Sequence, residues 1–311
     1  MVKDLIKNLR NKNILTISKL ISNVENENED YLNLLSKIHS YTGHSYRIGI
    51  TGPPGSGKSS ITNELIEKFI QNNYSVAIIA IDPSSPFNGG SILGDRIRFS
   101  NFFENSNIYF RSMSTRGSQG GLSKSATFVA DIFDASGYDI IIFETVGVGQ
   151  VEVDVIEAAD TVMVTLVPES GDDIQMMKSG LMEIADLYII NKSDRDGADR
   201  LYNSLNKILE LNKEISWNPT ITKTSAINGL GIDDLYDNIM NHKNFIEENN
   251  VKSKKMDDRY IKAIKSLIID ELNQNFWNSD KRINNILKKE LQLDYQQRLS
   301  PYKIAKKLLK I

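Results

Sequence analysis

Residues 46–60 read YRIGITGPPGSGKSS, which is a β-rich run, then a glycine-rich turn, then the start of a helical segment. The turn at 52–59 matches the pattern G-x-x-x-x-G-K-[ST]. Its glycines allow the backbone to wrap closely around an anion, and successive N–H groups then point at phosphate together with the helix N-terminus. This stretch therefore predicts a phosphate-binding loop between a strand and a helix.

The last residues of this loop have the chemistry of a phosphate and metal site. Lys58 is expected to reach the β- and γ-phosphates of a nucleotide, and the Ser59 hydroxyl is expected to bind Mg²⁺. The nucleotide-binding residues predicted here are Gly52, Pro53, Pro54, Gly55, Ser56, Gly57, Lys58, Ser59 and Ser60.

From residue 45 onward, short β-rich runs alternate with helical runs. Several of the β-rich runs are apolar nearly throughout, as strands covered on both faces must be. Strands are predicted at Tyr46–Thr51, Val76–Ile81, Ile108–Met113, Ile140–Phe143, Val162–Val167, Leu187–Ile190 and Thr220–Thr224, with helices at Ser59–Asn72 and Leu201–Leu211. This alternation predicts an α/β fold with a doubly wound, mostly parallel sheet, which binds ligands at the carboxyl ends of its strands.

Polar helical segments flank the predicted sheet. Residues 1–44 carry apolar side chains at near-helical spacing. After a polar linker or helix junction at 247–258, helices are predicted at Ile261–Trp277, Ile283–Leu293 and Pro301–Ile311. The predicted domains are an N-terminal helical arm (1–44), a nucleotide-binding domain (45–245) and a C-terminal helical arm (246–311). Such arms serve in self-association and partner binding or cap the same core, and the sequence leaves both readings open.

Three acidic residues are candidates for a magnesium site. Glu144 and Asp82 each follow a predicted strand, and Asp95 lies in the segment GDRIR. Mg²⁺ requires hard oxygen ligands. The predicted metal ligands are therefore Ser59, Asp82, Asp95 and Glu144, although each carboxylate alone is also compatible with a helix cap.

The segment after Glu144 reads TVGVGQ. Gly147 and Gly149 suit a loop that rearranges when the γ-phosphate leaves. Gln150 is a candidate for orienting the attacking water. The catalytic residues predicted from the sequence are Lys58, Glu144 and Gln150.

The strand predicted at Leu187–Ile190 is followed by NKSD, which matches the N-K-x-D pattern for guanine. The Asp194 carboxylate can accept from guanine N1–H and N2–H₂ together, whereas adenine would leave it facing a lone pair. Asn191 is expected to contact the opposite edge of the ring and the neighbouring loops, and the Lys192 stem is expected to cover a face of the base. Ser225 and Ala226 follow the last predicted strand, and the Ala226 N–H is expected to meet guanine O6. The order of these motifs predicts a GTPase.

Composition narrows the remaining possibilities. The formal net charge of the 311-residue chain is -3, so nucleic acid is not a default partner. The chain has no cysteine and only His39, His44 and His242 as histidines, widely separated, for which metal binding is not expected. No signal peptide or bilayer-spanning apolar run is evident, so a cytoplasmic protein without a membrane partner is expected.

Longer segments resemble one family closely. They are DPSSPFNGGSILGDRIR (82–98), RSMSTRGSQGGLS (111–123), ETVGVGQ (144–150) and QMMKSGLMEIADLYIINKSD (175–194). These resemble the MeaB/ArgK family, the GTPase chaperones of adenosylcobalamin-dependent methylmalonyl-CoA mutase. The resemblance covers most of residues 45–235.

The resemblance implies partners that the motifs alone do not. Proteins of this family form homodimers through C-terminal helices, bind an acyl-CoA mutase that speeds GTP hydrolysis, and gate the transfer of adenosylcobalamin from an adenosyltransferase. Cobalamin would therefore reach this chain only through the partner. The GDDIQMMK segment would be a switch loop facing the mutase, with Asp172, Gln175 and Lys178 as its signalling residues.

Two departures from the family pattern fall in switch regions. Val151 and Glu152 follow Gln150 where the family has GQSE, and Pro168–Ser170 reads PES rather than PGA. Both affect the expected response to a partner more than nucleotide binding.

Two other functions are compatible with parts of this pattern. An older label for this family is an amino-acid transport kinase or ATPase, and NKSD argues against ATP. A metal-insertion GTPase is expected to carry a His-rich or cysteine-bearing metal site, and this chain has no cysteine and only three histidines.

Overall fold

The computed structural model describes residues 2–28, 30–82, 105–114, 121–145, 157–168, 184–211, 217–279, 281–293 and 297–308. The chain divides into two compact units, residues 1–256 and residues 257–311. The boundaries expected from the sequence, 44/45 and 245/246, stay a prediction.

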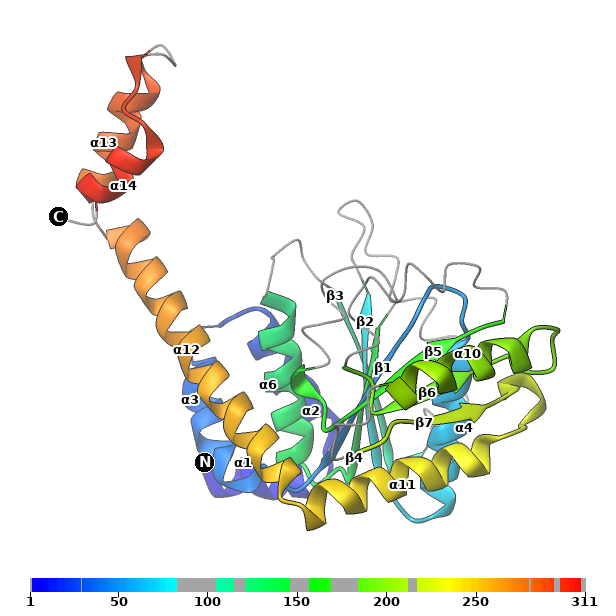
Figure 1. Cartoon of the computed structure of the whole chain (residues 1–311). Helices are drawn as coiled ribbons and strands as arrows, with labels where there is room; N and C mark the ends of the chain where they lie inside the picture. The colour runs from blue at the N-terminus through cyan, green and yellow to red at the C-terminus, as the bar shows by residue number, and fades with distance from the viewer. Residues whose placement is uncertain are drawn as a thin grey trace. The chain divides into compact units, whose positions relative to one another are not determined.

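The elements follow one another along the chain as strands alternating with helices, with helices at both ends (Figure 1). They are α1 (Val2–Arg10), α2 (Ile14–Glu25), α3 (Tyr31–Ile38), η1 (His39–Tyr41), β1 (Tyr46–Thr51), α4 (Lys58–Gln71), β2 (Val76–Asp82), β3 (Ile108–Ser114), α6 (Gly121–Ala135), β4 (Ile140–Thr145), β5 (Thr161–Leu166), β6 (Leu187–Ile190), α10 (Ala198–Leu211), β7 (Thr220–Lys223), η3 (Ala226–Asn228), α11 (Ile232–Glu248), α12 (Val251–Ser279), α13 (Lys281–Leu291) and α14 (Pro301–Leu308).

The strands form one seven-stranded sheet of order β3-β2-β4-β1-β5-β6-β7. Every pairing is parallel. The predicted fold class is confirmed, and each predicted strand differs from the observed one by at most two residues at an end. Because the sheet is parallel, the segments that follow all seven strands leave from one edge, called here the carboxyl edge.

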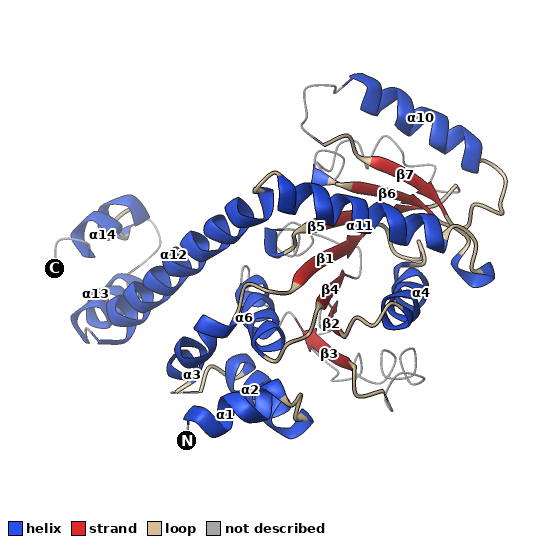
Figure 2. Cartoon of the chain, turned by 90° about the horizontal axis from the view of Figure 1, so that it is seen from below, coloured by secondary structure: helices blue, strands red, loops and turns tan. Residues whose placement is uncertain are grey.

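The sheet is covered by helices on both faces, which explains why its central strands, such as β4, are apolar nearly throughout. In β1, Ile48 and Ile50 are fully buried in a cluster with side chains of α4 and α11, such as Leu65 and Leu235. Arg47 points to the opposite face, where α6 packs. Figure 2 shows α4 and α6 on opposite sides of the sheet.

The polar segment expected to be a linker or junction at 247–258 is mostly helical. The helix α11 ends at Glu248 and α12 begins at Val251, so only two residues separate them. Asn250 has a φ of 58°, the left-handed conformation that Asn tolerates better than most residues. The polar composition reflects solvent-facing positions of two helices.

The N-terminal helices belong to the first unit. Helices α2 and α3 pack on α6, with Tyr31 against the ring of Phe128. The carboxylate of Glu25 at the end of α2 pairs with Arg111 on the edge strand β3. These helices therefore cover the β3 side of the sheet.

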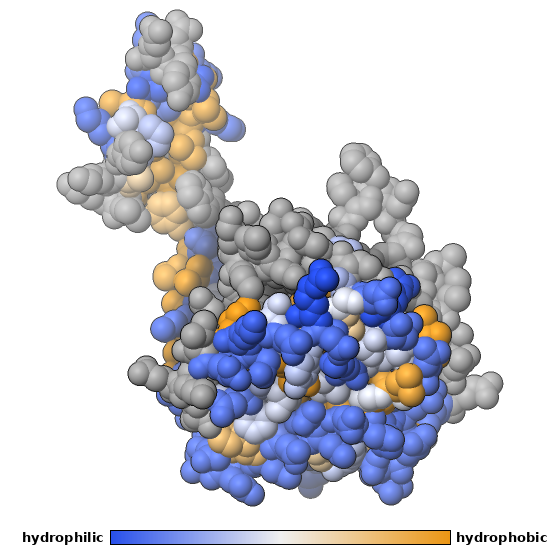
Figure 3. Space-filling view, turned by 45° about the vertical axis from the view of Figure 1, so that its right-hand side comes forward, coloured by the Kyte–Doolittle hydropathy of each residue, from blue (hydrophilic) through white to orange (hydrophobic). Residues whose placement is uncertain are grey.

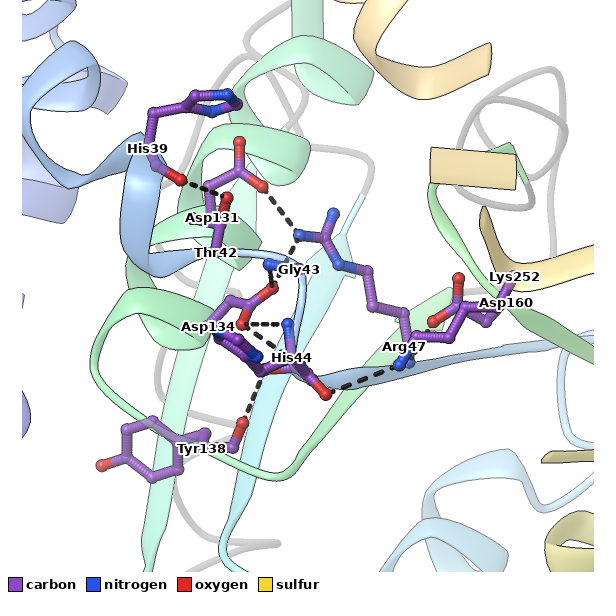
Figure 4. Close-up of polar contacts among 11 residues, drawn as sticks. His39, Thr42, Gly43, His44, Arg47, Asp131, Asp134, Tyr138, Asp160 and Lys252 are labelled. Atoms are coloured by element: carbon purple, nitrogen blue, oxygen red, sulfur yellow. Dashed lines mark hydrogen bonds and ion pairs between the residues drawn. The ribbon is translucent and has the colours of Figure 1, made fainter. Parts of the chain in front are cut away.

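A buried ionic cluster lies where the chain enters β1 (Figure 4). The Asp134 carboxylate on α6 accepts from the backbone N–H groups of Gly43, His44 and Ser45 at 2.8, 3.1 and 3.1 Å. The guanidinium of Arg47 lies 3.5 Å from it and 2.7 Å from Asp131. Although burial disfavours its charge, the neighbouring carboxylates hold the pKa of Arg47 above its ordinary value.

We expect the substitution Asp134→Asn to lower the free energy of unfolding by about 2 kcal/mol, because three backbone donors and a buried cation lose a charged acceptor. Urea denaturation measures this change. The comparison variant is Asp131→Asn, which among the described residues changes one acceptor of Arg47 but no acceptor of a backbone N–H and whose side chain is 31% exposed, so it should cost less than Asp134→Asn. Equal losses in the two variants would contradict the role given to Asp134.

The second unit has a small apolar core of its own. Ile283, Ile304 and Leu308 are buried, with Phe276, Ile286 and Leu287 packed against them. None of the helices in the described part of either unit is long and apolar enough to cross a lipid bilayer.

Candidate functional site

The glycine-rich loop leaves β1 at the centre of the carboxyl edge, and two of its glycines, Gly52 and Gly57, are sterically required. Gly52 has a φ of 138°, and a Cβ there would lie 2.1 Å from the carbonyl oxygen of Thr165 on β5. Gly57 has a φ of 91° and caps α4, and its Cβ would lie 2.2 Å from Nδ2 of Asn191. The loop is thus fitted closely between β5 and the segment after β6.

The Lys58 side chain folds back over this loop. Its Nζ donates to the carbonyl oxygens of Gly52 and Pro53 at 2.6 and 3.0 Å, and the residue is 6% exposed. A buried ammonium needs such partners, because its desolvation is costly. The positive charge therefore sits at the rim of the phosphate loop.

Ser59 and Glu144 meet beside Lys58. The Ser59 hydroxyl, in the first turn of α4, donates to Oε1 of Glu144 on β4. Glu144 is 7% exposed, and β4 is the strand next to β1. A hydroxyl and a carboxylate side by side fit Mg²⁺, which takes one or two carboxylates and completes its shell with water and phosphate oxygens. Among the described residues, no cluster of three or more Asp, Glu, His or Cys side chains forms a metal site by itself.

The guanine motif begins at the end of β6, two strands from β1. Asn191 is 3% exposed, and both the oxygen and the nitrogen of its amide form hydrogen bonds within the protein. Its Nδ2 donates to the carbonyl of Ser56 at 2.8 Å, and its Oδ1 accepts from Thr224 Oγ1 and the Ala226 N–H, each at 3.2 Å. Asn191 therefore binds three loops together, and the Ala226 N–H that was expected to meet guanine O6 donates to Asn191 here.

Lys192 makes a second link across the pocket. Its φ of 55° is uncommon for a residue other than glycine. Its Nζ donates to the carbonyl of Gly55 at 2.8 Å, so the stem spans from the guanine motif to the phosphate loop. A stem in this position is suited to cover a face of the base.

The Asp194 carboxylate is exposed and accepts from the Ser225 hydroxyl at 2.6 Å. Ser225 Oγ in turn accepts from Asn228 at 2.8 Å. The hydrogen bond from Ser225 holds the pKa of Asp194 below its ordinary value. A lowered carboxyl pKa means that the charge is lost only at strongly acidic pH, so Asp194 is ionised at neutral and mildly acidic pH.

Part of the predicted site lies outside the described residues: Asp95, Gln150, Asp172, Gln175 and Lys178. Asp82 is the last residue of β2, and its side chain is not described. The sequence analysis gave no role to Thr224, whose hydroxyl donates to Oδ1 of Asn191. Its position directly before the predicted site residues Ser225 and Ala226 was the signal that could have identified it.

Comparisons with known proteins agree with this geometry. The sequence model described as Methylmalonyl Co-A mutase-associated GTPase MeaB matches residues 17–281. A protein of Pyrococcus abyssi is 40% identical over 316 residues, covering 100% of this chain and 96% of the relative. GTPase ArgK of Escherichia coli K12 is 37% identical over 248 residues, covering 76% of this chain and 75% of the relative.

The fold is shared with a solved structure as well. The crystal structure of a protein named LAO/AO transport system kinase has a TM-score of 0.74 at 24% identity and covers 99% of this chain and 96% of that chain. The resemblance drawn from the motifs is confirmed by the family match. The chain belongs to the MeaB family and is a P-loop GTPase.

Proposed function

We propose that this GTPase binds an adenosylcobalamin-dependent acyl-CoA mutase, foremost methylmalonyl-CoA mutase, and gates the loading and protection of its cofactor. An adenosyltransferase would deliver that cofactor. The observation that carries the proposal is the family match over residues 17–281, which includes the nucleotide pocket and α12 together. GTP binding and hydrolysis in the nucleotide pocket would provide the conformational switch. The mutase is proposed as the client because the family is named for its association with methylmalonyl-CoA mutase.

Under this proposal, the chain's own residues would have the following roles. The loop amides and Lys58 would hold the β- and γ-phosphates and stabilise the charge that develops during in-line attack by water. Ser59 and Glu144 would hold Mg²⁺, which neutralises phosphate charge when bound. Asp82 and Asp95 stay predicted as further ligands, Gln150 as the water-orienting residue, and Asp172, Gln175 and Lys178 as partner-sensing residues.

The test is GTP turnover by the full chain with and without purified methylmalonyl-CoA mutase. We expect slow turnover alone, faster turnover with the mutase, and co-elution of the two proteins. The Lys58→Ala variant plus mutase controls for contaminating hydrolysis. Normal GTP turnover with neither acceleration nor co-elution would refute the client and leave the GTPase assignment intact.

We propose that the second unit mediates homodimer formation. Four side chains spaced three or four residues apart form an exposed apolar stripe on α12: Ile261, Ile264, Ile268 and Leu272, exposed by 49, 40, 54 and 62%. Apolar surface is also visible on this unit in Figure 3. A continuous stripe on one helix beside a small core favours burial against a second helix.

For this interface we expect Ile268→Asp to raise the dimer dissociation constant by at least about 100-fold, because one buried aliphatic side chain is lost from each protomer and each contributes about 1.5–3 kcal/mol. Light scattering after size exclusion over a concentration series measures it. The exposed Lys262→Ser, which does not share the three-or-four-residue spacing of Ile261, Ile264 and Ile268, serves as the control. A wild-type protein that is monomeric at all concentrations would contradict the stripe's role.

A further inference from the structure

The first residues of α12 touch the sheet at the edge opposite the nucleotide pocket. These residues, 251–256, are called here the α12 root, and they belong to the first unit. Lys252 Nζ donates to the carbonyl of His44 at 3.5 Å, and Lys255 Nζ donates to the carbonyl of Asp160 at 2.6 Å. His44 lies just before β1 and Asp160 just before β5 (Figure 4).

Lys255 also reaches the residue just before β6. Its Nζ lies 3.6 Å from Oδ2 of Asp186. The α12 root thus contacts the amino ends of β1, β5 and β6, which are three neighbouring strands. At their carboxyl ends, β1 leads into the phosphate loop and β6 leads into NKSD.

Asp186 is held from several directions at once. Its Oδ2 accepts from the Val162 N–H at 2.8 Å, and its Oδ1 lies 3.4 Å from Nε2 of His242 on α11. Its carbonyl accepts from the Trp217 indole at 2.9 Å. Although burial alone would raise it, the contacts with His242 and Lys255 hold the pKa of Asp186 below its ordinary value. The carboxylate of Asp186 is therefore charged, and the ammonium of Lys255 is one of the groups that stabilise this charge.

A short strand connects Asp186 to the guanine motif. The four residues of β6 are each 0% exposed and are hydrogen-bonded to β5 and β7 on both sides. Asp186 and Asn191 are five residues apart, about 16 Å along an extended strand. A close-packed strand transmits a displacement of one end to the other, because interiors are densely filled. At the far end, Asn191 holds the Ser56 carbonyl of the phosphate loop.

We infer that Lys255 is a positioning residue for the guanine motif: by holding Asp160 and Asp186, the α12 root sets where NKSD meets the phosphate loop. Coupling between two sites is reciprocal. Nucleotide in the pocket therefore stabilises the α12 root, and the helix that continues into the second unit begins on a segment that senses the nucleotide. This rests on the guanine site assigned above and not on the identity of the client.

The experiment compares the full-length wild type with Lys255→Met, which keeps the stem and removes the charge. Dissociation of a fluorescent GDP analogue is followed by chase with unlabelled GDP, and GTP turnover gives KM and kcat. We expect dissociation and KM to rise about 2- to 30-fold, with kcat within about twofold. Lys255→Arg should restore the wild-type values, because a cation is again present.

The matched control is Lys254→Met, an exposed lysine on the same helical turn, for which no change is expected. A Lys255→Met variant that loses thermal stability but keeps the wild-type dissociation rate and KM would overturn the inference, as would an equal change in Lys254→Met.

A second measurement needs no variant. Hydrogen exchange of the wild-type protein with and without GDP should show about twofold or slower exchange in residues 249–258 when GDP is bound. Equal exchange would overturn the inference even if Lys255→Met failed to fold. Failure of the wild type to bind GDP would instead contradict the guanine site itself.

Discussion

The substitution Lys58→Ala is expected to lower the rate of GTP hydrolysis by about 10³-fold, the cost of losing one charged donor to the developing charge. Lys58 is 6% exposed, and its ammonium lies at the rim of the phosphate loop, 2.6 Å from the Gly52 carbonyl. The other lysine of α4, Lys68, cannot replace it, because Lys68 lies further along the helix and pairs with Asp233 of α11. Phosphate release in a single turnover with Mg²⁺ and saturating GTP measures the loss.

The control for this prediction is Lys68→Ala, on the same helix and outside the loop, which should turn over within about twofold of the wild type. Thermal unfolding of both variants separates a folding defect from a loss of chemistry. Wild-type turnover in Lys58→Ala would remove the basis for placing phosphate in this loop.

The substitution Asp194→Asn is expected to abolish the preference for GTP over ATP, which should be about 10⁴ in the wild type. The carboxylate matches the two donors of guanine, N1–H and N2–H₂, whereas an amide presents one acceptor and one donor. That pair suits xanthine, which has N1–H and a carbonyl at C2, so xanthosine triphosphate should bind better than GTP. The Ser225 hydroxyl can still donate to the remaining oxygen, which keeps the loop in place.

Competition of each triphosphate against a fluorescent nucleotide measures this change. Asp196→Asn, two residues further in the same exposed turn, should leave the preference as it is. Unaltered discrimination in Asp194→Asn would mean that guanine is recognised elsewhere in the protein.

The fold was predictable from sequence because its signals are local. Several strands, such as Leu187–Ile190, are short apolar runs covered on both faces, and glycines or polar residues follow them in the sequence. The phosphate loop was predictable for the same reason, since its glycines, lysine and serine are adjacent in the chain.

The contacts that hold the loops to one another were not predictable in this way. Asn191 was expected to contact both the base and the neighbouring loops, and its loop contacts are to Ser56, Thr224 and Ala226; the motif alone did not specify these partners. The link from Lys255 to Asp186 joins residues far apart in the chain, and nothing in one sequence specifies which lysine of a polar helix lies near which carboxylate. Polar composition predicted a linker or helix junction at 247–258, and the junction between α11 and α12 lies there; composition did not decide between the two, because an exposed helix and a loop use the same residue types.

The amide of Asn191 also bears on the speed of nucleotide capture. Its hydrogen bonds are made by protein atoms alone, so the chain itself holds the three loops that Asn191 joins in place relative to one another. Capture then needs little ordering of these three loops, so differences in affinity among guanine nucleotides should appear mainly as differences in residence time.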